Sequence, residues 1–140
     1  DLLKLARFNN DAFSENFLFT PIAEEDFVAK YSQLKKYFDP ELIWIVEDEN
    51  GEIQAISFSI PDYLDKTGKT FIIKSLARKK ETPFRGIGAY IIGKTYQIAR
   101  RRKFERVIHA LMIHDNHSVN ISNNYEGDAF KSYTLYGKEL

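Results

Sequence analysis

The sequence predicts a single α/β domain of the α+β type, in which helices flank a mixed, mostly antiparallel sheet. Three patterns indicate this fold class. Apolar residues recur at helical spacing before residue 39, two strand-like runs flank an Asn-Gly pair at residues 50–51, and a strand-like run at 71–77 leads through a glycine-containing turn into a helical pattern. A chain of 140 residues, 44% hydrophobic and 29% charged, is long enough for one buried core.

Helices and then a hairpin are predicted in the first half of the chain. Residues 2–18 carry apolar side chains that can share a face, so they are expected to form one broken helix or two short ones. A second helix is expected over residues 20–38, because Thr-Pro is a helix start signal and acidic residues follow it. Strands are predicted at 42–46 and 52–60, and the Asn-Gly pair between them is typical of a tight antiparallel turn.

The second half is predicted to alternate strands with helices. A buried strand at 71–77 precedes a helix over 88–102, whose apolar residues recur at helical spacing. The next strand is expected at 107–113, a short helix at 118–124, and a last strand or hairpin arm at Ala129–Tyr136. A chain that starts without methionine, directly in a helical pattern, suggests a piece of a longer protein in which a first strand precedes it.

Composition and charge exclude several function classes. Twenty basic and twenty acidic residues give no net charge, which leaves no overall electrostatic case for binding nucleic acid or a membrane. The basic run at residues 100–103 fits the negative end of the preceding helix better than a nucleic-acid patch. The absence of cysteine excludes disulfides, thiolate zinc sites and a cysteine nucleophile. No apolar run reaches the ~20 residues that span a bilayer, and no signal-peptide pattern opens the chain, so a cytoplasmic protein is expected.

The turn before the long helix has the features of an anion-binding site. It places the backbone N–H groups from Arg85 to Tyr90 at the positive end of a helix, where phosphate or pyrophosphate binds. Gly86 and Gly88 lack the side chains that would hold a phosphate away from the backbone. The turn is not a P-loop, because no lysine with serine or threonine follows its last glycine, nor a dinucleotide fingerprint, whose third glycine is replaced by Ile91.

The run Arg85–Ala89, which opens a long helix directly after a strand, resembles the pyrophosphate-binding motif of the GNAT superfamily. This superfamily comprises the acyl-CoA-dependent N-acyltransferases. Its motif reads Gln or Arg, two residues, Gly, any residue, then Gly or Ala. The residues from Arg85 to Gly88 match, whereas Pro83 stands at the leading position. The predicted order of elements is also that of a GNAT domain, so the resemblance covers nearly the whole of residues 1–140.

The resemblance implies that the protein uses acetyl-CoA or a related acyl-CoA as co-substrate. The residues that it implies for binding this cofactor are Leu76, Ala77, Arg85, Gly86, Ile87, Gly88, Ala89 and Asn116. Leu76 and Ala77 lie where the central strand of the family offers backbone groups to the pantetheine arm. Asn116 matches the asparagine that the family has at the start of its short helix.

Candidate proton donors and acceptors follow from the chemistry of acyl transfer, in which the amine loses a proton and the leaving thiolate gains one. The tyrosine that the family places in the short helix falls at Asn123, so Tyr125 is the candidate acid, ahead of Tyr133 and Tyr136. His114, at the end of a predicted strand, is the candidate base. A neutral histidine with a pKa near ~6.5 can accept the ammonium proton directly or through water.

The other histidines have structural interpretations. His109 alternates with the apolar residues of its strand, which favours a core histidine held by a hydrogen bond. His117 is typical of a solvated helix residue. Because His109 and His114 are an odd number of positions apart on a predicted strand, their side chains would face opposite sides of the sheet. No metal site is therefore expected.

Three functions remain open on the sequence. An N-acyltransferase that acts on a small-molecule or peptide amine is favoured. The alternative is a catalytically degenerate module that binds CoA or another phosphate ligand, supported by the displaced tyrosine and by the absence of an acid in the strand at 71–77. A structural or interaction domain, whose aromatic residues only build a core, is the third. A serine hydrolase is disfavoured because the sequence has no nucleophile-elbow motif.

Overall fold

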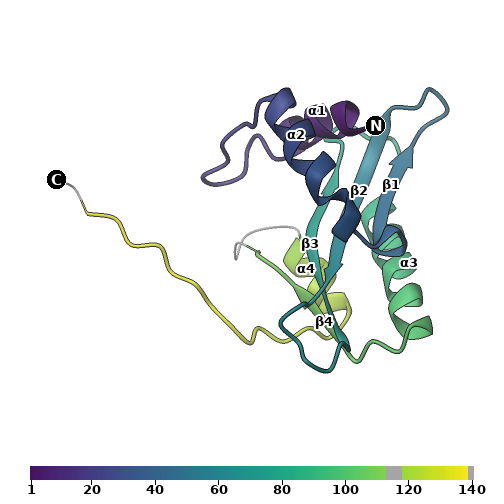
Figure 1. Cartoon of the computed structure of the whole chain (residues 1–140), viewed down its shortest axis with the longest axis vertical. Helices are drawn as coiled ribbons and strands as arrows, with labels where there is room; N and C mark the ends of the chain where they lie inside the picture. The colour runs from purple at the N-terminus through teal and green to yellow at the C-terminus, as the bar shows by residue number, and fades with distance from the viewer. Residues whose placement is uncertain (113–117, 139–140) are drawn as a thin grey trace.

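A four-stranded sheet in the order β1-β2-β3-β4 forms the centre of the computed structural model, which describes residues 1–112 and 118–138. The strands are β1 (Ile43–Glu47), β2 (Ile53–Pro61), β3 (Thr70–Arg78) and β4 (Arg106–His109). β2 pairs antiparallel with both β1 and β3, whereas β4 pairs parallel with β3 (Figure 1). The prediction of a mixed, mostly antiparallel sheet is therefore confirmed.

Helices cover both faces of this sheet. They are α1 (Leu2–Ala12), α2 (Glu24–Leu34), α3 (Ile87–Arg101) and α4 (Ser118–Asn124), with 3-10 turns at Lys35–Tyr37 and Pro40–Leu42. α1 and α2 lie on one face, and α3 and α4 lie on the other (Figure 1). α3 connects β3 to β4, which makes the strand–helix–strand crossover that parallel pairing requires.

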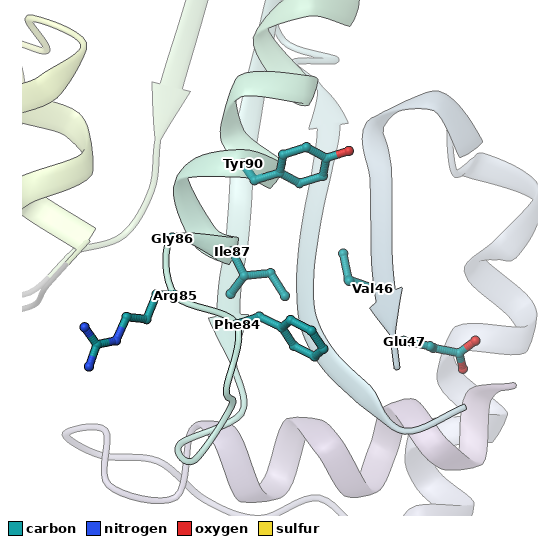
Figure 2. Close-up of a pocket in the computed structure, with 7 residues that line it drawn as sticks. All are labelled: Val46, Glu47, Phe84, Arg85, Gly86, Ile87 and Tyr90. Atoms are coloured by element: carbon teal, nitrogen blue, oxygen red, sulfur yellow. The ribbon is translucent and has the colours of Figure 1, made fainter. Parts of the chain in front are cut away.

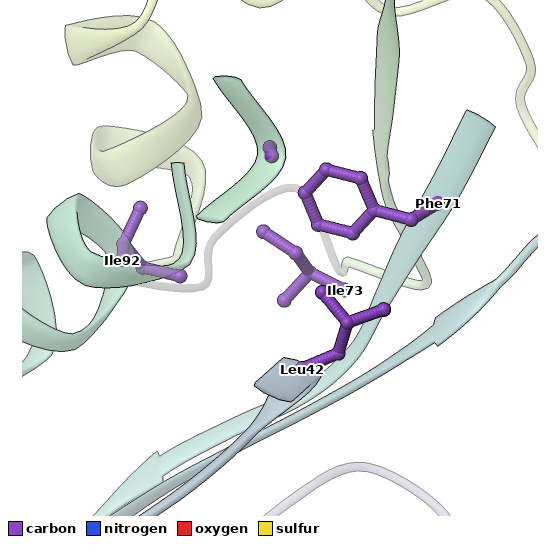
Figure 3. Packing of buried hydrophobic residues seen from close by; sticks show 5 residues of the cluster. Leu42, Phe71, Ile73 and Ile92 are labelled. Carbon is purple, nitrogen blue, oxygen red and sulfur yellow. The ribbon is translucent and has the colours of Figure 1, made fainter. Parts of the chain in front are cut away.

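Two apolar layers hold the helices on the sheet. On the α3 face, Phe71 and Ile73 of β3 pack with Leu42 and with Ile92 of α3 (Figure 3). On the other face, Phe8 of α1 packs against β2. The alternation of side chains along β3 sends its large residues to the α3 face, so burial of this face fixes the register of the strand.

The first two helices differ from their predicted extent. α1 continues without a break to Ala12 and then ends, and Phe17, expected on its buried face, is 67% exposed. The cause is a tertiary contact that periodicity does not reveal. The Asn10 side chain donates to Ile22 O (2.8 Å) and accepts from Ile22 N (3.2 Å). This ties the end of α1 to the chain before α2, which starts at Glu24 instead of residue 20.

The predicted C-terminal strand is wrong. Residues 129–136 form no strand, and the segment runs away from the domain (Figure 1). No strand of the described part of the chain lies beside its alternating side chains, and Tyr133 and Tyr136 are 71% and 93% exposed. A period-two pattern permits a strand, but pairing and burial are needed to form one.

The basic run at the end of α3 contributes to ion pairs within the fold. Arg101 pairs with Glu41, and Arg102 pairs with Asp39. These contacts join the C-terminus of α3 to the turn before β1. Within the described residues, no helix is both long and apolar enough to cross a membrane.

The core layer on the α3 face leads to a prediction about stability. Ile92 is 1% exposed, and its replacement in Ile92→Ala should lower the free energy of unfolding by about 2–5 kcal/mol, because a cavity remains between α3 and β3. Ile45→Ala is the matched control, since Ile45 is 41% exposed on the edge strand. Urea unfolding of both variants measures the difference. Equal losses would contradict this account of the core.

Candidate active site

A β-bulge in β3 shapes the candidate site. Across from β2, Ser75 lies opposite Phe58 and Ile73 lies opposite Ser59, so Lys74 is an extra residue on its strand. A bulge bends its strand, increases the local twist and changes the direction of the extra side chain. Such bulges are common beside active sites.

β3 and β4 separate at this bulge. Their last paired residues are Ile73 and His109, and one further hydrogen bond runs from Ala110 N to Ile73 O (3.2 Å). Beyond this bond, a pocket of about 100 Å³ lies between the two strand ends. We call it the splay pocket. Parallel strands that part at their carboxyl ends form a common place for ligands.

The splay pocket is bordered by helices of both layers. Phe13 and Asn16, from the loop after α1, line it on one face of the sheet. Ile92 of α3 and Ile121 of α4 line it on the other face. A molecule in this pocket would therefore contact both layers of the fold.

The start of α3 offers backbone donors. Gly86 caps the helix with φ +76°, a left-handed conformation that favours glycine, and no side chain caps this end. The first helical bond runs from Tyr90 N to Gly86 O (2.9 Å). The N–H groups of Ile87, Gly88 and Ala89 precede this bond, so no carbonyl of the helix accepts them. They lie at the positive end of the helix dipole.

Fewer backbone N–H groups are free at the start of α3 than the sequence predicts. The prediction extended from Arg85 to Tyr90, but Arg85 N donates to Pro83 O (3.1 Å), and Tyr90 N makes the first helical bond. Of the six predicted amides, four remain, from Gly86 to Ala89, and three of these, from Ile87 to Ala89, belong to the helix itself. The Arg85 side chain is exposed and points in the opposite direction from Phe84 and Ile87 (Figure 2).

Gly88 connects this helix end to the splay pocket. A Cβ added at Gly88 would lie 3.9 Å from Ile121 Cδ1, an ordinary contact distance. Ile121 itself lines the splay pocket. The free amides, Gly88 and the pocket therefore follow one another along the surface between α3 and α4.

A second, larger hollow lies on the other side of the turn. It measures about 330 Å³ between the start of α3 and the end of β1. Phe84, Ile87 and Tyr90 point toward Val46 and give it apolar walls, whereas Arg85 points away (Figure 2). We do not place the reaction here, because this hollow lies between α3 and β1, away from the parting strands, and its walls carry few polar groups.

A partly buried hydrogen-bond network begins at His109, which lines the splay pocket. His109 Nε2 is 3.0 Å from the Tyr96 hydroxyl on α3, and its Nδ1 is 2.5 Å from Ser122 Oγ on α4. A neutral imidazole donates through one nitrogen and accepts through the other, so one hydroxyl donates to His109 and the other accepts from it. Burial lowers the pKa of His109 and so favours this neutral form. Three elements, α3, β4 and α4, are joined by one side chain.

Tyr125, the candidate acid, packs against this network. Its ring stacks on Tyr96 with centroids 4.4 Å apart, and a Cβ at Gly93 would lie 3.9 Å from its hydroxyl. Burial and the nearby Tyr125 raise the pKa of Tyr96. Tyr125 thus lies between α4 and α3, but it is not among the described residues that line the splay pocket.

The remaining predicted site residues fall in two groups. Leu76 lines the splay pocket, whereas the Ala77 side chain packs toward α1. Because β4 pairs with β3 only as far as Ile73, the backbone of Leu76 and Ala77 has no strand partner on that side among residues 1–112 and 118–138. His114 and Asn116 lie outside the described residues.

Sequence reasoning missed Lys74, Tyr96 and Ser122. A signal for the bulge was present, since Ile73 and Leu76 are three positions apart and yet both pack in the core on the α3 face, where regular alternation allows only even spacings. No local pattern indicates the network, because its members are 13 residues apart in each direction from His109.

The buried network predicts a pH dependence of stability. Since the folded-state pKa of His109 lies below the unfolded value of about 6.5, the unfolded chain takes up the proton first as the pH falls. Stability should be complete above about pH 6.5 and decrease below it. Melting temperatures of the wild type and His109→Gln between about pH 8 and pH 5 test this. The difference between the two curves isolates His109, because His114 and His117 titrate in both proteins. A difference that does not change with pH would contradict the prediction.

Known proteins resemble this chain in structure but not in sequence. The sequence matches no protein-family model, and no curated protein matches it significantly. An N-acetyltransferase from Staphylococcus aureus Mu50 superimposes with a TM-score of 0.69 at 14% identity, over 90% of this chain and 76% of that one. A ribosomal-protein-alanine N-acetyltransferase from Brucella melitensis gives a TM-score of 0.68 at 19% identity, over 89% and 77%.

A third structure is an aminoglycoside acetyltransferase from an uncultured soil metagenomic sample, in complex with sisomicin. It gives a TM-score of 0.61 at 20% identity, over 99% of this chain and 87% of that one. At identities of 14–20%, these superpositions establish the architecture alone. The chain has the fold of the GNAT N-acetyltransferases.

Proposed function

We propose that the protein is an acyl-CoA-dependent N-acyltransferase, which transfers an acetyl or related acyl group to an amine. One observation carries the proposal. Gly88, whose amide is free, lies beside Ile121, which lines the splay pocket, and these features mark a path on one side of α3. A long ligand with an anionic middle and a narrow arm would fit such a path.

The residues along the path suit acyl-CoA. The amides of Ile87, Gly88 and Ala89 would hold the pyrophosphate at the positive helix end, and Arg85 would add a charge-assisted contact. The unpaired β3 backbone at Leu76 and Ala77 would bond the amides of the pantetheine arm. We retain Asn116 as a further cofactor contact from the sequence motif. Bound acyl-CoA supplies the acyl group in activated form, as a thioester.

The reaction needs one group of this chain to accept a proton and another to donate one. The amine nitrogen forms a bond to the acyl carbon, the bond from that carbon to sulfur breaks, the amine gives up a proton, and the thiolate takes one. We propose His114 as the group that accepts the amine proton and Tyr125 as the group that protonates the thiolate. Holding both reactants in the splay pocket would supply further acceleration by orientation.

A degenerate CoA-binding module is the second candidate. It is favoured by the absence of an acid on β3 and by the position of Tyr125 outside the lining of the splay pocket. Titration calorimetry with CoA and turnover of acetyl-CoA with a panel of amines separate the two. Binding together with transfer supports the enzyme, binding without transfer supports the module, and no binding overturns both.

The helix end gives the sharpest test of cofactor binding. Gly88→Asp places bulk and negative charge beside the three amides. Losing even two charge-assisted contacts, at roughly 1.5–3 kcal/mol each, would weaken CoA binding by about two orders of magnitude or more. The fold should survive, because the nearest atom to a Cβ is 3.9 Å away and an acid suits a helix N-terminus.

Two matched variants separate size from charge at this position. Gly88→Asn has the size of aspartate without its charge and should weaken CoA binding less, and Gly88→Ala should weaken it least. CoA affinity by calorimetry is measured beside the melting temperature of each variant. A Gly88→Asp protein that melts like the wild type and binds CoA equally well would place the cofactor elsewhere.

The proposed acid and base predict separate kinetic effects. Tyr125→Phe keeps the stacked ring but removes the hydroxyl, so it should lower kcat with little change in CoA affinity. His114→Ala should lower turnover and change its pH dependence near neutrality. Steady-state rates across pH, with CoA affinity measured on the same proteins, provide the test. Unchanged rates in both variants would remove these side chains from the reaction.

A further inference from the structure

Lys74 has an unusual place in the candidate site. It is the extra residue of the β3 bulge, its side chain is exposed, and it lines the splay pocket. A bulge changes the direction of its extra side chain. Here it brings a lysine to the mouth of the pocket at the point where β3 leaves β4.

The position of the Lys74 ammonium group is defined by an aromatic platform. Its Nζ lies 5.9 Å from the centroid of the Phe58 ring. The Phe58 ring itself makes T-shaped contacts with the rings of Phe38 and Tyr31, whose centroids lie 5.0 Å and 6.4 Å away. These aromatic residues belong to the α2 face of the sheet, so the charge of Lys74 lies on the face opposite α3 and α4.

Within the described part of the chain, Lys74 has no ion-pair partner. Lys80, a nearby lysine, contacts Glu15 Oε1 (3.0 Å) and Ser14 Oγ (3.1 Å) in the loop after α1. By contrast, Lys74 forms no ion pair with any residue in 1–112 or 118–138. Among the described residues that line the splay pocket, it is the only one with a formal charge, and none is an aspartate or glutamate.

The two faces of the pocket therefore have different roles. The path from the start of α3 enters on the face of Ile92 and Ile121, which leaves the face of Phe13, Asn16 and Lys74 for the second substrate. A cation without an acidic neighbour among the described lining residues attracts an anionic group and repels a polycation. The same charge lowers the pKa of a nearby ammonium group, which favours the neutral amine that attacks the thioester.

From this arrangement we infer that the acceptor amine carries an anionic group, a carboxylate or a phosphate, and that Lys74 binds it. The inference rests on the proposed function, since it names the class of amine that would be acylated at this site. Lys74 is then the residue that selects the acceptor, and it takes no part in binding CoA.

Matched amines that differ only in charge test the inference. The pairs are phosphoethanolamine with ethanolamine and β-alanine with propylamine, and spermidine serves as a polycation. The wild type should prefer the anionic member of a pair by about tenfold or more in kcat/KM, the effect expected of one charge-assisted contact. The two pairs show whether phosphate or carboxylate is preferred.

Substitutions of Lys74 test whether this residue causes the preference for anionic amines. Lys74→Gln should abolish it, mainly through KM, and Lys74→Glu should reverse it in favour of the neutral or cationic amines. CoA affinity and the melting temperature should remain those of the wild type in both variants. Lys66→Gln, in the exposed turn between β2 and β3, is the control and should leave the preference unchanged. A wild type without preference, or a preference that survives in Lys74→Gln, would overturn the inference.

A failure of the proposed transferase function can be distinguished from a failure of the inference about Lys74. If CoA binds but no amine is acylated, the protein is not a transferase for this panel, and the pocket is then tested by binding alone. Saturation-transfer NMR of the CoA-loaded protein should detect phosphoethanolamine more strongly than ethanolamine, and Lys74→Gln should remove the difference. Equal signals from the two amines in the wild type, or none from either, would overturn the inference.

Discussion

The parting of β3 from β4 is the constraint on which the candidate site depends. Parallel pairing lasts for only four residues, because the bulge at Lys74 bends β3 away from its neighbour. Continued pairing would fill the splay pocket with a regular ladder. Backbone N–H and C=O groups that leave a ladder need other partners, since unpaired polar groups inside a protein are costly. The unpaired edge of β3 is thus suited to a ligand that carries amides of its own.

Packing of α3 sets the other half of the site. Ile87, at the first helical position, is buried with Ile91 and Ala55, so the apolar core fixes the helix end over the sheet. Gly86 takes the left-handed conformation that lets the chain enter the helix at this point. The three free amides are therefore held in place before any ligand arrives. Groups positioned in advance lose little freedom on binding, which favours affinity.

Charges are balanced over the whole chain but unevenly distributed in space. At the C-terminus of α3, Arg101 and Arg102 pair with acids of the turn before β1. At its N-terminus, the first turn holds no acid, and Arg85 lies exposed just before it. The cations at the C-terminus suit the negative end of the helix dipole, whereas the acid-free N-terminus leaves its positive end open to an anionic ligand. A net charge of zero therefore does not imply a site without electrostatic preference, and Lys74 shows the same on the opposite face of the sheet.

Local signals in the sequence determined much of the fold. The hairpin at Asn50–Gly51, where Gly51 has φ +77°, and the strand, glycine turn and helix around Gly86 form as predicted. Both depend on conformational preferences of a few adjacent residues and on periodicities within one element. The same signals were enough to predict the fold class. They also predicted the position of the free amides at the start of α3 to within two residues.

Contacts between elements decided the features of the structure that local signals did not predict. The end of α1 depends on bonds between Asn10 and Ile22, and the network around His109 joins residues from three elements that no local pattern relates. Residues 129–136 have the alternation of a strand and yet form none, because a strand requires a partner that the sequence pattern does not supply. The bulge at Lys74 likewise follows from the burial of Ile73 and Leu76 on one face. Sequence thus determined the elements, whereas packing between them decided where the strands part and which side chains meet there.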